Sequence, residues 1–407
     1  MHICLVSDFF GANYGGAETT SSLWVKKLLE RGHKVTVLTA HPKKIFPEKN
    51  KNFKIIKFLG FPIPKAGGKI HAGLPINPFK MYKIYKLFRD EIDVVHIFLV
   101  PSLIAATAIT LARWTKKPIV TSIHNQPEYV FYNLKTSPTN HKFFKLFKRI
   151  IPIKKTKLLK WSYKYITNSY LNKSDLVVGP SNFAIETYKK YGLTVPQRTI
   201  SSGIDFSKFD GKGKPEIFLK KYNLTKTGNK VLFVGRLYQE KKIDILLKAA
   251  KLVLEKLPET NFILVGTGSE EDKLKLIAKK LGIEDNVLFT GRVSNRMLPN
   301  VYHASDLFVF PSILELLGLV LLEAMSAGLP LIGTDICAIP ESVINGYNGY
   351  TFKKNDYRQL ASKILKILQN KEIQEKFSSN SLKLVKHHDI ENSIDEMEEE
   401  YRNLIQN

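Results

Sequence analysis

Short apolar runs alternate with amphipathic stretches along almost the whole chain. The first runs, at residues 2–10, 34–39, 53–58, 94–99 and 118–123, have the length and composition of buried strands. The stretches between them include helical patterns at residues 17–31, 78–89 and 102–115. Strands that alternate with helices predict a parallel, doubly wound sheet, whose ligands bind beyond the carboxyl ends of the strands.

A second alternating series begins after a polar, turn-rich stretch at residues 211–230. Its expected strands are at residues 231–234, 262–265, 287–290, 307–310 and 330–334, and its last helices are at 356–369, 372–387 and 390–405. At 407 residues the chain is long enough for two such α/β domains, each with its own core. We place them at residues 1–200 and 201–385, followed by a helical segment at 386–407.

Composition narrows the class of protein. Hydrophobic residues make up 44% of the chain, as in globular proteins, and the only cysteines, Cys4 and Cys337, lie in apolar contexts. Reduced core cysteines predict a cytoplasmic setting. The apolar run at residues 3–6 is too short for a signal peptide, and the stretch 97–112 contains Pro101 and falls short of a membrane span.

Positive charge is concentrated in the first half of the chain. Residues 1–200 hold 33 Lys and Arg against 10 Asp and Glu, whereas residues 201–407 hold 29 against 27. Between Tyr129 and Ser174 there are eleven cations and no acid. A basic region of this kind indicates an anionic partner, such as a membrane leaflet, an anionic glycan or nucleic acid. General solubility is the alternative for the scattered lysines.

The acid-free segment contains two amphipathic patterns. Phe143, Phe147, Ile150 and Ile151 form one helical stripe, and Leu158, Trp161 and Tyr165 begin a second one. Basic amphipathic helices with aromatic residues suit an anionic membrane surface, and packing of the stripes on the domain core is the open alternative. The residues expected to contact the membrane or an acceptor are Lys142, Lys145, Phe147, Lys148, Arg149 and Trp161.

The most informative stretch runs from Asp306 to Asn348. An expected strand ends at Pro311-Ser312, Glu315 follows in a loop, and a helix is predicted from Gly318 to Gly328 with Glu323 in its second turn. The free N–H groups of a helix start favour phosphate, and carboxylates accept hydrogen bonds from sugar hydroxyls. A sugar nucleotide offers both groups. The alternative roles are helix capping for Glu315 and an exposed face for Glu323, but Glu323 stands among apolar residues.

This stretch resembles glycosyltransferase family 4. The resemblance is carried by the Glu315-x7-Glu323 pair after Pro-Ser, by the following Ala-Met-Ser-Ala-Gly-Leu-Pro, and by Gly235-Arg-Leu-x-x-Glu-Lys241 in an earlier loop. It implies the GT-B fold, in which two Rossmann-like domains face each other across a cleft and the final helix crosses back to the first domain. It also implies retaining transfer of a hexose from a UDP- or GDP-linked sugar, with no cofactor and no essential metal.

The resemblance also implies roles for particular residues. His124, Arg236, Lys241 and Glu315 are expected to be catalytic. The donor is expected to contact Gly15, Gly16, Arg236, Lys241, Gly266, Arg292, Glu315, Gly318, Leu319 and Glu323. The chain departs from the family pattern at Leu316-Leu317, and at Lys242, where glycine is usual.

Three classes of function remain open on the sequence. The first is a glycosyltransferase that acts on a membrane lipid, such as diacylglycerol or phosphatidylinositol, at the inner face of the membrane as a peripheral protein. The second is an enzyme of the same fold that acts on a soluble or polyprenyl-linked cell-envelope glycan. The third is a nucleic-acid-binding or non-catalytic protein. No nucleic acid is expected as a partner, because the aromatic residues follow helical stripes and form no stacking platform.

Overall fold

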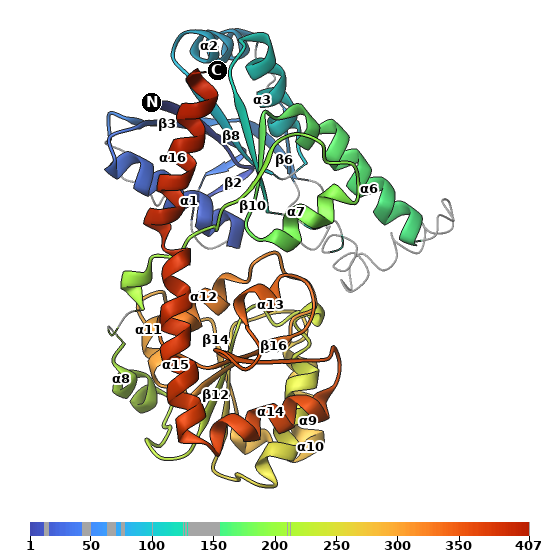
Figure 1. Cartoon of the computed structure of the whole chain (residues 1–407), viewed down its shortest axis with the longest axis vertical. Helices are drawn as coiled ribbons and strands as arrows, with labels where there is room; N and C mark the ends of the chain where they lie inside the picture. The colour runs from blue at the N-terminus through green and yellow to red at the C-terminus, as the bar shows by residue number, and fades with distance from the viewer. Residues whose placement is uncertain are drawn as a thin grey trace. The chain divides into compact units, whose positions relative to one another are not determined.

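The chain forms two compact units, each built around a parallel sheet (Figure 1). The computed structural model describes residues 1–11, 16–42, 50–62, 71–74, 78–99, 101–124, 126, 128, 155–209, 211 and 213–406. Unit 1 consists of Met1–Gly203 and Ile390–Asn407, and unit 2 consists of Ile204–Asp389. From the sequence we placed the boundaries at 200/201 and 385/386.

Unit 1 contains a seven-stranded sheet in the order β11-β10-β9-β8-β1-β3-β5, with every neighbouring pair parallel. Its strands are β1 His2–Val6, β3 Lys34–Thr39, β5 Phe53–Lys57, β8 Val94–Leu99, β9 Ile119–Ile123, β10 Leu176–Gly179 and β11 Gln197–Thr199. Two short ribbons accompany it, β2 Phe9–Phe10 with β4 His41–Pro42 and β6 Leu59–Pro62 with β7 His71–Leu74. The chain reverses its direction of travel between β1 and β8, which makes that point the sheet's switch point.

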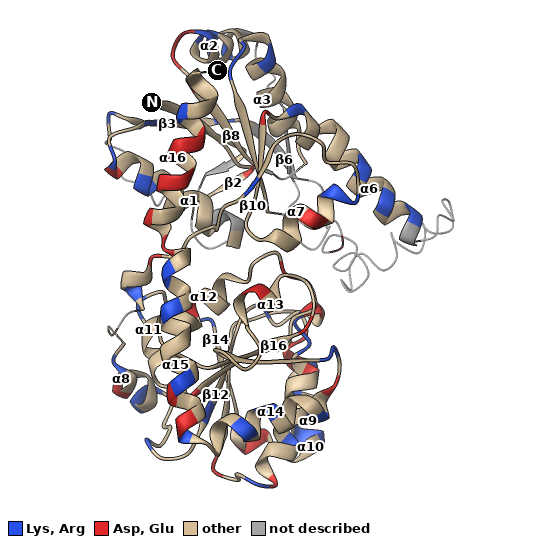
Figure 2. Ribbon diagram, in the orientation of Figure 1, with Lys and Arg blue, Asp and Glu red and all other residues tan. Residues whose placement is uncertain are grey.

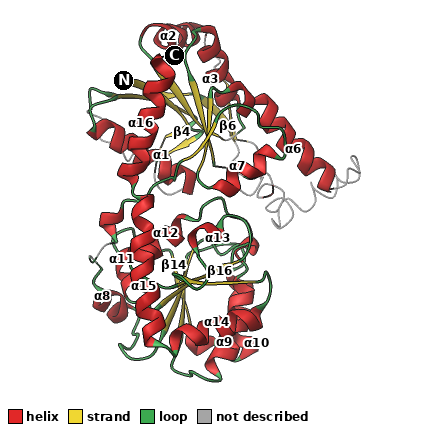
Figure 3. Ribbon diagram, in the orientation of Figure 1, coloured by secondary structure: helices red, strands yellow, loops and turns green. Residues whose placement is uncertain are grey.

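Helices cover both faces of this sheet (Figure 3). They are α1 Gly16–Glu30, α2 Pro78–Asp90, α3 Leu103–Trp114, α6 Lys155–Ser169, α7 Asn182–Lys189 and α16 Ile390–Gln406. Helices α1 and α16 share one core cluster with β1, β3 and β8. Right-handed crossovers toward β8, β9 and β10 place α2, α3 and α6 on the opposite face.

Helix α16 is held to unit 1 by its acidic side. Arg31, directly after α1, contacts Glu391 at 2.6 Å, Asp395 at 2.5 Å and Glu398 at 3.4 Å, and Arg198 contacts Glu400 at 2.8 Å. The acidic residues of the last helix thus face arginines of the same unit. The buried Tyr401 also hydrogen-bonds His96 in the middle of β8.

Unit 2 contains a six-stranded parallel sheet in the order β14-β13-β12-β15-β16-β17. Its strands are β12 Lys230–Val234, β13 Asn261–Val265, β14 Val287–Gly291, β15 Leu307–Phe310, β16 Leu331–Thr334 and β17 Gly349–Phe352. In order of sequence this is the arrangement 3-2-1-4-5-6 of a dinucleotide-binding domain, with the switch point between β12 and β15. The prediction of two doubly wound Rossmann-like sheets is confirmed.

The helices of unit 2 follow the apolar spacing of the sequence. They are α8 Pro215–Lys221, α9 Ile243–Leu254, α10 Glu271–Leu281, α11 Leu298–His303, α12 Leu319–Ser326, α13 Ile339–Ser342, α14 Tyr357–Leu368 and α15 Lys371–Val385. Helix α9, for example, buries Ile243, Leu246, Leu247, Ala250 and Val253, at intervals of three and four residues. Each large aliphatic side chain buried in this way stabilises the fold by roughly 1.5–3 kcal/mol.

Helix α6 carries the second of the two amphipathic patterns. Its core side consists of Tyr163, Ile166 and Thr167, whereas Trp161 and Tyr165 are exposed. Core packing, one of the two interpretations of the stripe, is therefore wrong for these two rings. The first pattern, with Lys142, Lys145, Phe147, Lys148 and Arg149, lies outside the described residues. None of the helices in the described part of the chain combines the length and hydropathy of a membrane span.

Candidate functional site

The candidate site of unit 2 lies at the carboxyl edge of its sheet, where β12 and β15 are neighbours. In parallel sheets ligands bind at this edge, beside the switch point. The loop after β12 carries Arg236 and the single-turn helix η3 Gln239–Lys241. The loop after β15 carries Ser312 and Glu315, and then α12 begins. The Ile313 N–H donates to the Glu240 carbonyl at 3.0 Å, which ties the two loops together.

Lys241 and Glu315 are brought together by this arrangement although 74 positions separate them in sequence. The Lys241 ammonium forms an ion pair with Glu315 Oε1, and the Ser312 hydroxyl donates to the same oxygen at 3.0 Å. Lys241 Nζ also lies 5.2 Å from the centre of the Phe310 ring. Both side chains of the pair are mostly buried. The site therefore presents a cation and a carboxylate side by side.

Glu240 is a residue of this site to which the sequence analysis gave no role. It is fully buried, and neither of its carboxylate oxygens has a hydrogen-bond partner among the described residues. Burial raises the pKa of Glu240, while Lys241 and Arg236 act in the opposite direction. Its place directly before Lys241, in the motif at residues 235–241, was the local signal in the sequence that could have indicated Glu240.

Helix α12 begins beside this ion pair. Its N-cap is Gly318, whose φ of 79° is in the left-handed region that glycine favours. The first turn of any helix presents N–H groups that have no partner within the helix, so its start favours anions. The prediction of a helix from about Gly318 is confirmed, with Leu319 as its first residue.

Glu323 is in the second turn of α12 and is largely buried. The hydroxyl of the fully buried Tyr302 donates to Glu323 Oε2 at 2.7 Å. Burial raises the pKa of Glu323 from its ordinary value to about 7, although the Tyr302 hydrogen bond and the charge of Lys208 both lower it. An exposed, solvated role for Glu323 is thereby excluded. Tyr302, on α11, was missed by the sequence analysis because no local motif connects it to Glu323.

The turns after β12, β13 and β14 lie next to one another at the same edge. The Gly235 N–H donates to the Val265 carbonyl at 2.9 Å, and the Gly266 N–H donates to the Gly291 carbonyl at 2.9 Å. A Cβ on Gly266 would lie 1.9 Å from the Gly235 carbonyl oxygen, so only glycine fits there. The exposed guanidinium of Arg236 lies 5.2 Å from the Tyr238 ring centre. Arg292 is also exposed, directly after β14.

The two departures from the family pattern have structural outcomes. Leu317 is buried in the core of unit 2, where it packs as an additional apolar side chain. Lys242 adopts a left-handed conformation with φ 51° and ψ 38°. The turn geometry that glycine favours is therefore kept at position 242 although lysine occupies it.

In unit 1, His124 follows β9 at the carboxyl edge of the sheet. Its ring stacks on Phe98 with a centroid distance of 4.8 Å and an interplanar angle of 2°. Its Nε2 atom is buried and has no hydrogen-bond partner in the described structure. Burial lowers the pKa of His124 to about 4, so the ring is neutral near pH 7. A neutral imidazole can donate or accept one hydrogen bond at this atom.

Asp8 is a second buried group at this edge that the sequence analysis did not single out. It follows β1, and burial raises its pKa to about 7, opposed by a hydrogen bond with Ser102. Gly16 begins α1, which agrees with the predicted helix, whereas Gly15 lies outside the described residues.

Comparison with known families covers nearly the whole chain. The model described as Glycosyltransferase Family 4 matches residues 14–208, and the model described as Glycosyl transferases group 1 matches residues 215–384. The sulfoquinovosyl transferase SQD2 of Arabidopsis thaliana is 28% identical over 359 residues, which is 86% of this chain and 63% of that protein. The alpha-monoglucosyldiacylglycerol synthase of Streptococcus pneumoniae is 27% identical over 343 residues, with 82% and 70% covered. The chain thus spans about two thirds of the length of these curated relatives.

Solved structures show the same fold. Anabaena HepE in complex with UDP superimposes with a TM-score of 0.75 at 19% identity, with 99% of this chain and 100% of that chain covered. WaaG, a glycosyltransferase involved in lipopolysaccharide biosynthesis, gives a TM-score of 0.69 at 19% identity, with 97% and 98% covered. The chain therefore belongs to glycosyltransferase family 4, and its two doubly wound units are those of the GT-B fold.

Proposed function

We propose that this protein is a retaining glycosyltransferase that moves a hexose from a nucleotide-diphosphate sugar to an acceptor at the membrane surface. The observation that carries the proposal is the arrangement at one edge of the unit 2 sheet. There the Lys241–Glu315 pair adjoins the start of α12, and the Tyr302–Glu323 hydrogen bond lies in the second turn of the same helix. Phosphate, sugar hydroxyl and ribose hydroxyl groups each find a matching partner there.

In this proposal the leaving diphosphate is bound by Arg236, Lys241 and the N–H groups at Gly318 and Leu319. A positive charge about 4 Å from a phosphate contributes roughly 4 kcal/mol at an effective dielectric constant of 20. Charge that develops on the leaving group is therefore stabilised by groups already in place. As in the family that the chain resembles, we expect neither a cofactor nor an essential metal.

Glu315 and Glu323 are proposed to bind hydroxyl groups. Lys241 and Ser312 both contact Oε1 of Glu315, so we assign its other oxygen to the transferring sugar. Tyr302 contacts Oε2 of Glu323, and we assign Oε1 to the ribose of the nucleotide. When a neighbouring side chain contacts one oxygen of a carboxylate, the orientation of the second oxygen is fixed as well. This favours a single defined pose of the substrate.

The remaining donor contacts are assigned by place in the fold. Gly266 and Arg292 stand in adjacent turns beyond β13 and β14, where we propose that the nucleotide base lies. Gly15, Gly16 and His124 are the candidates of unit 1, the glycines for the diphosphate and His124 Nε2 for the sugar or the acceptor. The structures of HepE with UDP and with UDP-glucose support a UDP-linked donor.

For the acceptor we propose a membrane lipid of the diacylglycerol or phosphatidylinositol type, with the protein peripheral at the inner face of the membrane. The relative from Streptococcus pneumoniae supports this assignment, because its name gives a monoglucosyldiacylglycerol as its product. A different acceptor class is supported by a Bacillus anthracis relative, 24% identical over 372 residues, named N-acetyl-alpha-D-glucosaminyl L-malate synthase. The alternative is therefore a soluble or polyprenyl-linked acceptor.

The test is release of nucleoside diphosphate from UDP-, GDP- and ADP-sugars, with and without liposomes that contain diacylglycerol or phosphatidylinositol. We expect release from one donor class that depends on the lipid. Release only with a soluble or polyprenyl-linked acceptor would replace the lipid assignment. No release from any donor and acceptor would contradict the proposed activity.

Alanine variants test the assigned cations. Arg236→Ala and Lys241→Ala are each expected to reduce turnover about 10²- to 10³-fold. Lys248→Ala, an exposed lysine on α9, is the matched control and should turn over normally. Normal turnover of Arg236→Ala or Lys241→Ala would overturn the diphosphate assignment.

A further inference from the structure

One face of unit 1 exposes an unusual number of large aromatic side chains. On α2, Phe79 is 80% and Tyr82 is 65% exposed, and on α3, Trp114 is 71% exposed. On α6, Trp161 and Tyr165 are 61% and 46% exposed. Right-handed crossovers place these three helices on the same face of the sheet, and Figure 1 shows them in succession along unit 1. Clustered exposed apolar side chains mark interaction surfaces, whereas single ones do not.

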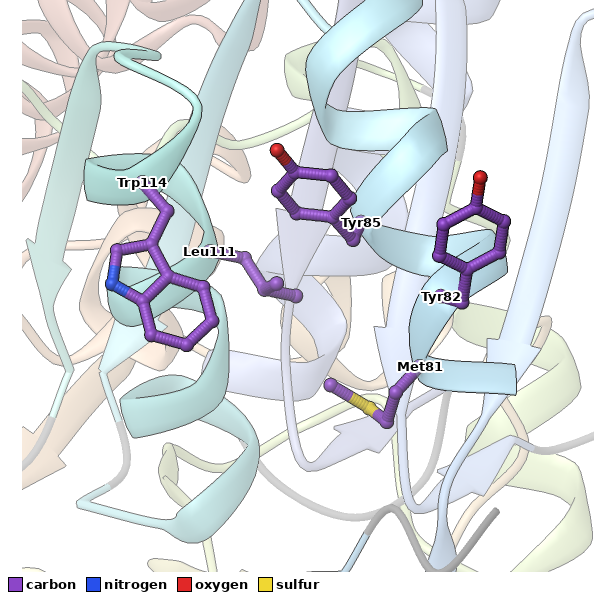
Figure 4. Close-up of a pocket in the computed structure, with 5 residues that line it drawn as sticks. All are labelled: Met81, Tyr82, Tyr85, Leu111 and Trp114. Carbon is purple, nitrogen blue, oxygen red and sulfur yellow. The ribbon is translucent and has the colours of Figure 1, made fainter. Parts of the chain in front are cut away.

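Two of the exposed aromatic residues, Tyr82 and Trp114, border an open apolar groove between α2 and α3. The groove has a volume of about 440 Å³ and is lined by Met81, Tyr82, Tyr85, Leu111 and Trp114. In Figure 4 the Met81 and Leu111 side chains point into the space between the two helices, with the three aromatic rings around them. A groove of this composition can accept hydrocarbon, but it offers few partners to a polar ligand.

On α6 the two exposed rings are paired. Trp161 and Tyr165, one turn apart, stack with a centroid distance of 5.4 Å and an interplanar angle of 14°. The opposite side of α6 packs inward through Tyr163, whose ring stacks on Tyr191 at 4.3 Å. The Trp161–Tyr165 pair is thus held on the outer side of a helix that is anchored through its other face.

The same three helices are strongly basic. Together they carry nine Lys and Arg and a single acid, Asp90, which is paired with Arg89 at 2.6 Å. Helices α1 and α16, on the other face, carry eight Asp and Glu against three Lys and Arg. Figure 2 shows this contrast between the lysines of α6 and the acidic side of α16. The exposed cations of the basic face include Lys83, Lys86, Lys157, Lys160 and Lys164.

We propose that the face formed by α2, α3 and α6, here the aromatic–basic face, docks on an anionic lipid bilayer. Tryptophan and tyrosine prefer the headgroup level of a bilayer, and lysines around them gain from anionic lipid. The α2–α3 groove then receives the hydrocarbon portion of a lipid while the surrounding lysines contact headgroup phosphates. An acidic protein or nucleic acid would satisfy the charge but would leave the apolar groove unfilled. The inference rests on the proposed membrane acceptor. It extends the contact from Trp161, which the sequence predicts, to α2, α3 and the groove between them, to which the sequence analysis gave no role.

The test is co-sedimentation of the full chain with vesicles, with no sugar donor present. We expect binding to phosphatidylcholine vesicles that contain 30% phosphatidylglycerol, a composition chosen for the assay, and much weaker binding to pure phosphatidylcholine. Each cation near an anionic surface contributes roughly five-fold, so the double variant Lys83→Ala/Lys86→Ala should bind about 25-fold less tightly. Trp114→Ala should bind about ten-fold less tightly or worse, as expected for removing a large apolar side chain that becomes buried only when the protein docks on the bilayer. Lys279→Ala/Lys280→Ala, exposed on α10 of unit 2, is the matched control and should bind normally.

Several outcomes would overturn the inference. Equal binding to both kinds of vesicle would show that the aromatic–basic face does not recognise anionic lipid. Equal losses in Lys83→Ala/Lys86→Ala and Lys279→Ala/Lys280→Ala would show that binding does not depend on this face. Normal binding of Trp114→Ala would exclude a contribution of the groove to vesicle binding. Recovery of binding in Trp114→Tyr would show that the loss in Trp114→Ala comes from the missing aromatic ring and not from a folding defect. Binding to duplex DNA without binding to vesicles would identify a nucleic-acid surface. Because no donor is present, this assay does not depend on activity. Vesicle binding here, together with no nucleoside diphosphate release in the separate donor assay, would refute the proposed function and leave this inference standing.

Discussion

The Tyr302–Glu323 hydrogen bond gives the sharpest test of the donor site, because it connects a buried pair to the pH dependence of donor binding. If Glu323 accepts hydrogen bonds from the ribose hydroxyls, it accepts them most strongly when it is ionised. Burial raises its pKa to about 7, so donor affinity should improve as the pH rises through that value. Tyr302→Phe removes the hydroxyl that stabilises the ionised form at 2.7 Å and changes little else in volume.

The magnitude follows from that hydrogen bond. A hydrogen bond to a charged group contributes about 1.5–3 kcal/mol, and 1.36 kcal/mol corresponds to one pKa unit. Tyr302→Phe should therefore raise the pKa of Glu323 further, by roughly one to two units. At pH 7 the ionised fraction then falls from about one half to between one tenth and one hundredth. The donor KM should rise about five- to fifty-fold at pH 7 and approach that of the unmodified protein above pH 9.

The assay is the donor KM between pH 5.5 and 9.5, measured by nucleoside diphosphate release. Tyr350→Phe, which removes the hydroxyl of another buried tyrosine of unit 2, is the control and should leave the midpoint unchanged. An unchanged midpoint in Tyr302→Phe would refute the reasoning, and so would a KM increase of the same size at every pH. The second result would show a general loss of fit instead of a change in ionisation.

The same carboxyl group affects stability in a direction that can be measured without any substrate. Its pKa in the folded state, about 7, lies above its ordinary value of 4.5, so the folded state binds the proton more tightly than the unfolded state. The stabilisation is fully present below pH 4.5 and is lost as the pH rises through 7. The difference of about 2.5 pKa units corresponds to about 3 kcal/mol. Glu323→Gln should remove this pH dependence from the unfolding of unit 2 in urea.

Three further predictions concern other parts of the structure. Lys242→Gly should raise the free energy of unfolding by up to about 1 kcal/mol, because glycine adopts φ 51° without strain. Urea denaturation measures this change, and a decrease would contradict the prediction. Arg31→Ala should cost about 1 kcal/mol at pH 7, because it removes the ion pairs with Glu391 and Asp395, while Glu398 keeps His33 and Arg402 as partners. This loss of stability should shrink as the pH falls through the depressed pKa of Glu391, since protonation of Glu391 removes the same ion pair in the unmodified protein. A difference in the free energy of unfolding between the variant and the unmodified protein that stays constant from pH 7 to pH 3 would contradict this prediction. His124→Asn should lower turnover without changing the shape of the pH profile between about 5 and 8, because the ring is already neutral there, and a new inflection in that range would show that His124 titrates during turnover.

The fold was predictable because its strands are short, continuous apolar runs. Strands buried on both faces need such runs, and crossover helices of a parallel sheet need apolar residues at intervals of three and four. Helix ends were less well defined. Helix α9 ends at Leu254, although Leu257 continues its apolar spacing, because the chain turns before Pro258.

The sequence could not decide which side of an amphipathic helix faces the core. In α6 both the stripe that contains Trp161 and Tyr165 and the stripe that contains Tyr163 and Ile166 have helical spacing. Tyr163 is buried because Tyr188 and Tyr191, from a later segment, pack around it. The choice therefore depends on tertiary contacts that periodicity along the chain does not contain.

Residues of the candidate site were predictable where a local motif carried them, and not otherwise. Arg236, Lys241, Glu315 and Glu323 stand in short patterns, and the structure places Lys241 against Glu315. Tyr302 precedes Glu323 by 21 positions on another helix, so only the fold reveals the contact.

The two Pro-Ser turns show how one local pattern supports two roles. Ser181, after β10, is followed at once by α7, and its hydroxyl accepts a hydrogen bond from the Ala184 N–H as an N-cap. Ser312, after β15, is followed by a longer loop, because α12 begins only at Leu319. Its hydroxyl cannot cap a helix that starts seven residues later, and it donates to Glu315 instead. The additional residues create the loop that holds a carboxylate beside Lys241, so the spacing between the turn and the helix determines whether this motif caps a helix or builds the candidate site.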